Sequence, residues 1–425
     1  MKLLIFFFTI LSLFTSTILF SQEWGTTNAI NGGRYDDIYF LNSDTGWTVN
    51  AIGQILHTVD KGNSWTIQHE SSDYFRAIDF INDQIGFAGT LSESLWKTED
   101  GGNTWIDIQD LLPVSVPGIC GLSHAGDYVY GVGFFDYPAY FIKSKDQGQT
   151  WTYTDLSEFA DGMVECHFLD TNIGFISGIK ENSGGIVLKT IDGGENWTQV
   201  LDTEGGSEYV WKLDFVTEDI VYGSIESFTG NTSRIIKSID GGNTWTIHVV
   251  DTQPLDLQGI GFISVDTGWV GPRHKPMYET TDGGLTWNEN PDLYQNLNRF
   301  FRINSEEMYG SGSYIHRYGE WNVSSLEEFN YDHAHTISKI SPNPFFNALK
   351  FHLTIDNSTN ARLDFYSTNG QLIQTFYSGN ITAGNYDYQL ESKHLNALQN
   401  GTYFIVLRTN EGFISVPVIK AGNQN

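Results

Sequence analysis

The feature that most constrains the fold is a short motif that returns six times along the chain. In its fullest form it reads T-x-D-G-G-x-T-W, so an aspartate, glycine and a tryptophan fall within six residues. Successive copies lie 40 to 48 residues apart, which predicts an array of one repeated structural unit. The aspartates are Asp60, Asp100, Asp146, Asp192, Asp240 and Asp282, and the tryptophans are Trp65, Trp105, Trp151, Trp197, Trp245 and Trp287.

Each repeat contains four short apolar runs separated by turn residues. The first run of each repeat ends at Phe40, Phe80, Leu122, Phe168, Phe215, Phe262 or Phe301, which makes seven units. Four β-prone runs at this period predict an all-β fold, a seven-bladed β-propeller over residues 22–325. Glu23 and Trp24 look like an outer strand with no blade of its own. Either this segment or Trp321 is therefore expected to close the ring.

The repeated motif has a mechanical interpretation. We expect each aspartate to accept hydrogen bonds from backbone N–H groups two or three residues on, which closes the turn between the third and fourth strands. The tryptophan then covers apolar surface between neighbouring sheets. A device that recurs in every blade cannot define one catalytic or metal site, so we interpret the motif as structural.

The motif resembles the Asp-box, or BNR, repeat shared by sialidases, some glycoside hydrolases and sortilin-like receptors. The fuller pattern, in which an apolar run ends in Phe and Gly-Trp comes before the box, is more similar to the propeller family of the photosystem II assembly and stability factors. The resemblance covers about residues 22–325. It implies a propeller fold and points to no particular activity.

The first 21 residues read as a signal peptide. Lys2 precedes an apolar run over residues 3–20, and a cleavage site fits before Gln22. The alternative is an uncleaved membrane anchor. We expect an exported protein without a membrane span once the signal is removed.

Charge divides the rest of the chain into two parts. Residues 22–330 carry 16 basic and 45 acidic residues, whereas residues 331–425 carry six of each. This step predicts a linker at residues 326–337. The acidic surface also argues against nucleic acid as a partner, because nucleic-acid binding needs positive charge.

Residues 338–425 alternate polar and apolar side chains in short runs, and Asn369-Gly370 is a strong hairpin turn. This pattern predicts a small Ig-like β-sandwich. The segment is similar to the type A sorting domain of the type IX secretion system of the Bacteroidetes. The resemblance implies that the secretion machinery is a partner and that the protein is secreted or held at the outer cell surface. The matching residues include Pro342, Asn343, Pro344, Gly370, Gly401, Tyr403 and Lys420.

A candidate binding side follows from the spacing of the repeats. Blades three to five carry extra residues between the inner strand and the box, which we expect in the loops between the second and third strands. Such insertions often mark the binding face of a repeat protein. Aromatic anchors there would suit a protein or glycan ligand, although they can also pack on their own blade. The candidate rim residues are Tyr74, Arg76, Phe134, Phe135, Tyr137 and Trp211.

These observations favour a monomeric binding or scaffold protein that is not an enzyme and takes no cofactor or metal. The sequence has no metal-ligand spacing of Cys or His, no phosphate-binding glycine loop and no G-x-S-x-G motif. The alternative is an extracellular glycoside hydrolase that acts through paired carboxylates. Cys120 and Cys166 are predicted at matching positions of neighbouring blades, either bridged or, as we favour, as buried thiols.

Overall fold

The computed structural model describes residues 22–30, 32–228, 230, 232–273, 276–290, 293, 296–320, 335–346, 348–367, 372–390, 398–409 and 412–421. Gln22–Glu320 form one compact unit, and the described residues after Glu320 belong to a second. Several predicted features fall outside the described residues: the signal peptide, Trp321, Gly370 and residues 326–334 of the linker.

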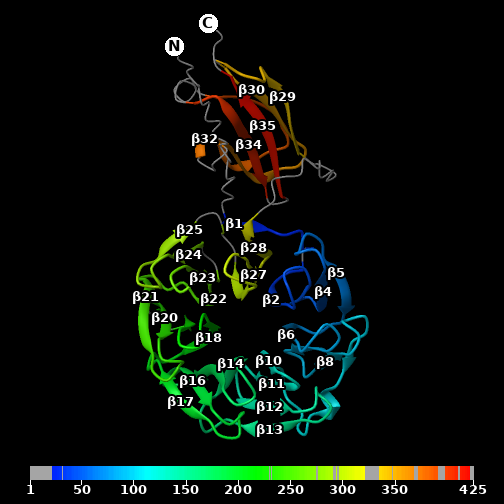
Figure 1. Cartoon of the computed structure of the whole chain (residues 1–425), viewed down its shortest axis with the longest axis vertical. Helices are drawn as coiled ribbons and strands as arrows, with labels where there is room; N and C mark the ends of the chain where they lie inside the picture. Colours follow the sequence, from blue (N-terminus) through cyan, green and yellow to red (C-terminus); the bar gives the residue numbers. More distant parts are fainter. Residues whose placement is uncertain are drawn as a thin grey trace, which may run out of the picture. The chain divides into compact units, whose positions relative to one another are not determined.

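The first unit contains seven four-stranded antiparallel sheets arranged round a common axis (Figure 1). This confirms the all-β class and the seven-bladed propeller. Blade 1 comprises β2 (Tyr35–Phe40), β3 (Gly46–Asn50), β4 (Gln54–Thr58) and β5 (Thr66–Glu70). Blade 2 comprises β6 (Phe75–Phe80), β7 (Gly86–Thr90), β8 (Leu95–Thr98) and β9 (Ile106–Asp107), followed by a 3-10 turn at Gln109–Leu111. Blade 3 comprises β10 (Gly121–Ala125), β11 (Tyr128–Gly133), β12 (Tyr140–Ser144) and β13 (Thr152–Asp155).

The remaining blades follow the same order, with the first strand innermost. Blade 4 comprises β14 (Gly162–Phe168), β15 (Gly174–Lys180), β16 (Gly184–Thr190) and β17 (Thr198–Asp202). Blade 5 comprises β18 (Glu208–Phe215), β19 (Val221–Ser227), β20 (Ser233–Ser238) and β21 (Thr246–Asp251). Blade 6 comprises β22 (Leu257–Phe262), β23 (Gly268–Pro272), β24 (Met277–Thr280) and β25 (Asn288–Asn290). Blade 7 comprises β26 (Leu297–Arg302), β27 (Met308–Gly312), β28 (Ile315–Glu320) and, from the start of the unit, β1 (Gln22–Thr26).

The ring is closed by its first strand. β1 pairs antiparallel with β28, and Gln22 stands opposite Glu320. Trp24 of β1 meets Trp269 of blade 6 edge to face, with ring centroids 5.1 Å apart. The segment at Glu23 and Trp24 therefore takes the closing role that the sequence left open.

Aromatic contacts between neighbouring blades explain the pair of Gly and an aromatic residue that four of the repeats carry at the start of the second strand. Trp47 of blade 1 stacks on Phe80 of blade 2, with ring centroids 3.7 Å apart. Gly46 comes just before it, and a Cβ there would lie 2.5 Å from the Phe40 ring. A larger residue at position 46 would clash with the inner strand, so blade 1 requires glycine there.

Two predictions about the blades are wrong. In blade 4 the extra residues lengthen the strands, since β15 and β16 have seven residues each whereas β3 and β4 of blade 1 have five. Residues 181–183 connect them, a loop no larger than residues 51–53 of blade 1. The connection is enlarged at residues 134–139 of blade 3 and 228–232 of blade 5.

The second wrong prediction is the alignment of blade 3. In blade 4, Phe168 pairs with Gly174, which in turn faces the box residue Thr190. The residue at this place in blade 3 is His124, not Leu122, because β10 continues to Ala125. Cys120 and Cys166 therefore do not hold matching positions. Both are free and buried, as favoured from the sequence.

The second unit is a sandwich of two sheets. One sheet has the order β29 (His335–Ser341), β30 (Lys350–Ile355) and β33 (Gly384–Gln389). The other has the order β32 (Leu372–Ile381), β31 (Thr359–Ser367), β34 (Gly401–Thr409) and β35 (Gly412–Lys420). Apolar side chains from both sheets, among them Phe351, Phe365 and Ile405, form a single buried core.

Candidate functional site

The inner strands of six blades share an irregularity that positions polar groups in the channel. Their pairing with the second strand shifts register by one residue at the same place, which leaves one residue of each inner strand unpaired. A β-bulge of this kind re-aims side chains and interrupts the alternation of inward and outward positions. The bulged residues are Asp36, Arg76, Val164, Trp211, Gln258 and Asn298.

Five of these residues, together with Arg34, form what we call the mouth cluster. It lies where the inner strands begin, at the end of the channel opposite the box turns. Asp36 Oδ1 lies 2.7 Å from both Arg76 Nη1 and Arg34 Nε. Arg34 Nη2 donates hydrogen bonds of 2.8 Å to Gln258 Oε1 and to Asn298 Oδ1. The cluster, which links blades 1, 2, 5, 6 and 7, consists of Arg34, Asp36, Arg76, Trp211, Gln258 and Asn298.

Trp211 and Glu226 complete this end of the channel. Trp211 Nε1 donates to Asn298 Oδ1 at 2.9 Å, and the Arg76 guanidinium lies 5.1 Å from the centroid of its ring. Gln258 Nε2 donates to Glu226 Oε1 at 2.7 Å. Burial raises the pKa of Glu226, and the bond from Gln258 opposes this only in part.

One residue further along the inner strands lies a second group of charges, which we call the channel ion cluster: Asp37, Glu165, Lys212 and Arg299. Arg299 of blade 7 donates to Asp37 of blade 1 at 2.8 Å and, at 2.6 Å, to Glu165 of blade 4. Lys212 Nζ lies 2.8 Å from the same Glu165 carboxylate. The cluster joins blades on opposite sides of the channel.

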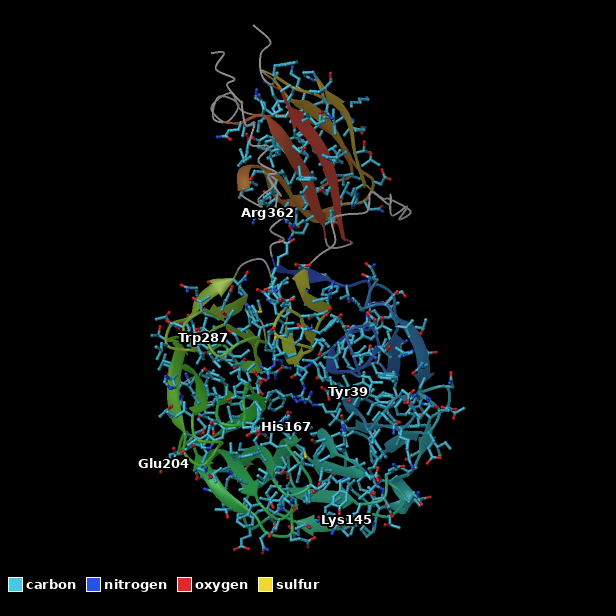
Figure 2. All side chains as sticks on the ribbon, in the orientation of Figure 1. Tyr39, Lys145, His167, Glu204, Trp287 and Arg362 are labelled. Carbon is cyan, nitrogen blue, oxygen red and sulfur yellow. The ribbon has the colours of Figure 1, made fainter. Side chains whose placement is uncertain are left out.

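The pKa values in this cluster follow from burial and from mutual attraction. Burial alone would raise the pKa of Glu165, but Arg299 and Lys212 outweigh it and hold that pKa below its usual range. Burial and the neighbouring Arg299 lower the pKa of Lys212 to about 8, with Glu165 opposing them. Tyr39 and His167, labelled in Figure 2, come two residues after Asp37 and Glu165 on the inner strands, and burial lowers the pKa of His167 to about 4.

The structure separates the predicted rim residues into two groups. Arg76 and Trp211 belong to the buried mouth cluster. Tyr74 is half-buried beside it, and burial together with Asp36 raises its pKa to about 12. Phe134 packs against the apolar core between blades 2 and 3.

Phe135 and Tyr137 are exposed, to 36% and 68%, on the enlarged loop of blade 3. The Phe135 carbonyl oxygen accepts a hydrogen bond of 2.6 Å from Tyr209 Oη of blade 5. Tyr209 lies edge to face with Trp211 and with Phe228, which is 58% exposed on the enlarged loop of blade 5. We call Phe135, Tyr137, Tyr209 and Phe228 the rim aromatics. The sequence prediction missed Tyr209 and Phe228, although the added length of blade 5 pointed to that loop.

The six box aspartates occupy separate turns on the opposite side of the blades. Asp240 is representative: Oδ1 accepts from the amide of Thr244 at 2.9 Å, and Oδ2 from the Thr244 hydroxyl at 2.6 Å. Ser238 Oγ donates to the same carboxylate at 2.9 Å. The carboxylate accepts from the amide four residues on in all six boxes, one residue beyond the predicted range. In three boxes it also accepts from the amide three residues on, as predicted. The ring of Trp197 meets Phe141 of the preceding blade, as expected for a residue that fills the space between sheets.

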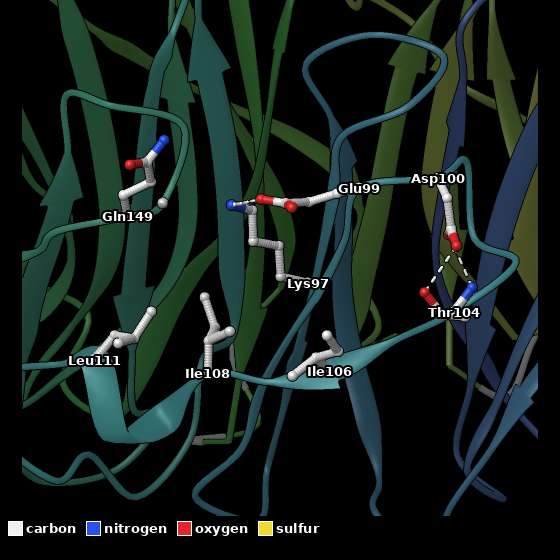
Figure 3. A pocket seen from close by; sticks show the side chains of 9 residues that line it. Lys97, Glu99, Asp100, Thr104, Ile106, Ile108, Leu111 and Gln149 are labelled. Carbon is white, nitrogen blue, oxygen red and sulfur yellow. Dashed lines mark hydrogen bonds and ion pairs between the residues drawn. The ribbon is translucent and has the colours of Figure 1, made fainter.

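Figure 3 shows a hollow of about 410 Å³ on the box side of blades 2 and 3. Its charged groups already have partners, since Lys97 Nζ lies 2.6 Å from Glu99 Oε1 and Asp100 accepts bonds from Thr104. Within the described ranges, no group of three or more His, Cys, Asp or Glu side chains is arranged to hold a metal ion. The described part of the chain also has no helix of the length and hydropathy needed to cross a membrane.

In the second unit, the predicted sorting residues lie around one end of β35. Asn343 Oδ1 accepts a hydrogen bond of 2.8 Å from the Ile419 amide, and Lys420 pairs with Gly401 of β34. Pro342 and Pro344 flank Asn343, and Phe345 forms a parallel bridge with Lys420. Tyr403 is buried in the sandwich core.

The comparisons with known proteins cover both units. Residues 339–421 match the family model described as the secretion system C-terminal sorting domain. A comparison with curated proteins finds no match. YCF48 from Cyanidioschyzon merolae has a TM-score of 0.56 at 19% identity, over 71% of this chain and 99% of that one. YCF48 bound to a D1 peptide has a TM-score of 0.54 at 16% identity, over 70% and 96%.

A third solved structure has a catalytic description. The GH74 xyloglucanase from Xanthomonas campestris has a TM-score of 0.51 at 12% identity, over 69% of this chain and 53% of that one. At these identities the likenesses show the fold alone. The sorting-domain match indicates where the protein goes. The chain carries, after a propeller similar in fold to YCF48, the C-terminal sorting domain of the type IX secretion system, and it is exported to the cell surface or the extracellular space.

Proposed function

We propose that the exported propeller is a monomeric binding protein without catalytic activity, and that it holds its ligand at the mouth cluster and the rim aromatics. The observation that carries this proposal is the exposure of three aromatic rings, Phe135, Tyr137 and Phe228, beside a buried polar cluster. Exposed aromatic side chains next to fixed polar groups are common anchors of binding sites.

The state of the channel carboxylates also favours binding over catalysis. Asp37 and Glu165 are held by Arg299, and Asp79 lies 2.8 Å from His124. Carboxylates tied in this way are poorly placed to exchange protons with a substrate. The structure of YCF48 with a D1 peptide gives a precedent for ligand binding by a propeller of this fold.

The test uses a triple variant, Phe135→Ala, Tyr137→Ala and Phe228→Ala, in the full chain. We leave Phe134 unchanged because it packs in the core. The matched control is Leu285→Ala, since Leu285 is 68% exposed, like Tyr137, but lies in a box turn. The readouts are binding to a glycan array and capture of partners from the native cell surface. We expect the triple variant to lose binding at unchanged Tm; unchanged binding would refute the proposed face.

A glycoside hydrolase remains the second candidate, and one observation favours it. Glu226 is a buried carboxyl group with a raised pKa that is linked through Gln258 to the mouth cluster, and a raised pKa of this kind is typical of a general acid. Release of reducing sugar from polysaccharides by the pure protein, abolished in Glu226→Gln, would establish this activity. We expect no release.

A further inference from the structure

We propose that the mouth cluster is a subsite for an uncharged oligosaccharide, whose adjacent hydroxyl groups pair with buried polar atoms that the protein leaves unpaired. The inference rests on the proposed function, because it assumes that this face of the propeller is the binding face. It adds the chemical class of the ligand.

Besides Arg34 Nε, which forms an ion pair with Asp36 Oδ1, three polar atoms in and next to the mouth cluster have no hydrogen-bond partner within 3.5 Å among the described residues: Asp36 Oδ2, Arg76 Nη2 and Glu226 Oε2. All three residues are at least 96% buried. A buried polar atom without a partner is costly, and such atoms are rare in folded proteins. A group that supplies partners for all three would therefore be favoured at this place.

The unpaired atoms specify what the missing partner must offer. The carboxylate oxygens of Asp36 and Glu226 require a donor, whereas Arg76 Nη2 requires an acceptor. An ionised carboxylate supplies an acceptor for the arginine but no donor for Asp36 and Glu226, whereas an ammonium group supplies donors but no acceptor. A hydroxyl group is both donor and acceptor, so a neutral ligand with neighbouring hydroxyls fits this set.

The surroundings favour a carbohydrate among neutral polar ligands. A sugar ring presents hydroxyls at its edge and an apolar C–H face, and the rim aromatics supply apolar surface for that face. Gln258 and Asn298 add planar amides that keep a partner when Arg34 shifts, since Gln258 Nε2 donates to Glu226 and Asn298 Nδ2 donates to the Asp36 carbonyl oxygen. Polar atoms inside and aromatic rings at the rim match the two kinds of surface that a pyranose carries.

Arg34 is the group that must move for the ligand to reach these atoms. Its side chain is 20% exposed, whereas those of Asp36 and Arg76 are 1% and 4% exposed. Arg34 is a long side chain with several rotatable bonds, and a shift of its guanidinium uncovers the atoms below while Asp36 keeps its pair with Arg76. Arg34 is thus a positioning residue that covers the subsite when it is empty.

The experiment measures binding of the full chain to defined tetrasaccharides by calorimetry. The probes are uncharged gluco-, manno-, galacto- and xylo-oligosaccharides, with uronate oligosaccharides as charged counterparts. We expect binding to at least one uncharged probe and weaker binding to uronates. Asp36→Asn and Glu226→Gln each exchange one unpaired acceptor for a donor, and each should weaken binding by about 10- to 100-fold. Leu285→Ala should bind like the unchanged protein.

The two polar variants keep the result interpretable. Glu226→Gln retains the oxygen that accepts from Gln258, so it provides the test if Asp36→Asn fails to fold, and Tm is measured for both. Wild-type affinity in both folded variants overturns the subsite, and so does preference for uronates. If no sugar binds but a surface protein is captured in a manner that depends on the rim aromatics, the carbohydrate inference fails while the proposed binding function stands. If no sugar binds and no surface protein is captured through the rim aromatics, both the carbohydrate inference and the proposed binding function fail.

Discussion

A single carboxylate organises each box turn. In blade 4, Asp192 accepts hydrogen bonds from the Asn196 amide at 2.9 Å, from Asn196 Nδ2 at 2.8 Å and from Thr190 Oγ1 at 2.8 Å. Three donors converge on the Asp192 carboxylate, which stays in contact with water. The hydrogen bonds therefore close the turn without burying a charge. This explains why the motif recurs in six blades without forming a site.

We predict that Asp192→Ala lowers the Tm of the propeller by about 2–6 °C, because several charge-assisted hydrogen bonds are lost together. The bonds from Asn196, with the bond from Thr190, lower the pKa of Asp192 to about 2, below the value of about 3.9 for an unfolded aspartate. The stabilisation is therefore complete above about pH 4 and is lost as pH falls toward 2. Calorimetry from pH 7 to pH 2 should show the two proteins converging in acid. Asp110→Ala, which removes an exposed carboxylate outside the boxes, should leave the Tm unchanged.

Residue-level patterns predicted the box turns better than the channel. The box is local, so one window of sequence contains every partner of its aspartate. The mouth cluster brings together Asp36, Gln258 and Asn298, whose contacts span more than 200 residues. A signal was present, since inner strands such as YDDIYF and EYVWKLDF carry charges within otherwise apolar runs. No local rule says which of these charges meet.

At the scale of the strand, blade 3 shows where repeat reasoning fails. Its first two strands are joined by Gly126 and Asp127 alone, whereas residues 169–173 join those of blade 4. The shorter turn moves the end of the inner strand to Ala125. An alignment that matches Leu122 with Phe168 of blade 4 is therefore wrong by two residues, since His124 is the structural equivalent. The strand count and order were predictable because periodicity fixes them, but turn length is free to vary in each copy.

The closing strand has a pH sensor beside it. His316 of β28 is buried; its Nδ1 lies 3.1 Å from Thr26 Oγ1 of β1, and its Nε2 has no hydrogen-bond partner among the described residues. Burial lowers the pKa of His316 to about 4, against about 6.5 in an unfolded chain. Protonation therefore favours unfolding of the blade that joins the two ends of the ring.

We predict that the free energy of unfolding falls by about 1.4 kcal/mol per pH unit through His316 as pH drops from 6.5 to 4, because only the unfolded state binds the proton in that window. Urea unfolding at pH 7, 6, 5 and 4 should show this slope. His316→Gln should reduce it by that amount, and any remaining slope belongs to other groups, such as His167. Parallel curves for the two proteins would contradict the assignment.

At the scale of the whole propeller, the channel ion cluster joins blades that the chain order keeps apart. Arg299 reaches Glu165 across the channel as well as Asp37 beside it. Buried ion pairs often add little net stability, but removal of one partner leaves an uncompensated charge. The cluster therefore fixes which blades face each other more than it adds to the free energy of folding.

We predict that Arg299→Met destabilises the propeller by about 3–5 kcal/mol, because Asp37 and Glu165 stay buried without their main partner. Adding Glu165→Gln to the same chain should recover part of this loss. Urea unfolding of the single and double variants gives the coupling energy. Strictly additive effects would show that the pair across the channel contributes nothing.

Ring closure by β1 has a consequence for unfinished chains. The strand that leads the propeller docks on β28, so Trp24 remains exposed and the last blade keeps an open edge until about 300 residues have followed it. Closure over such a separation costs entropy that only a complete ring recovers. Protease resistance of the leading strand therefore reports, in one measurement, that every blade is present and in place.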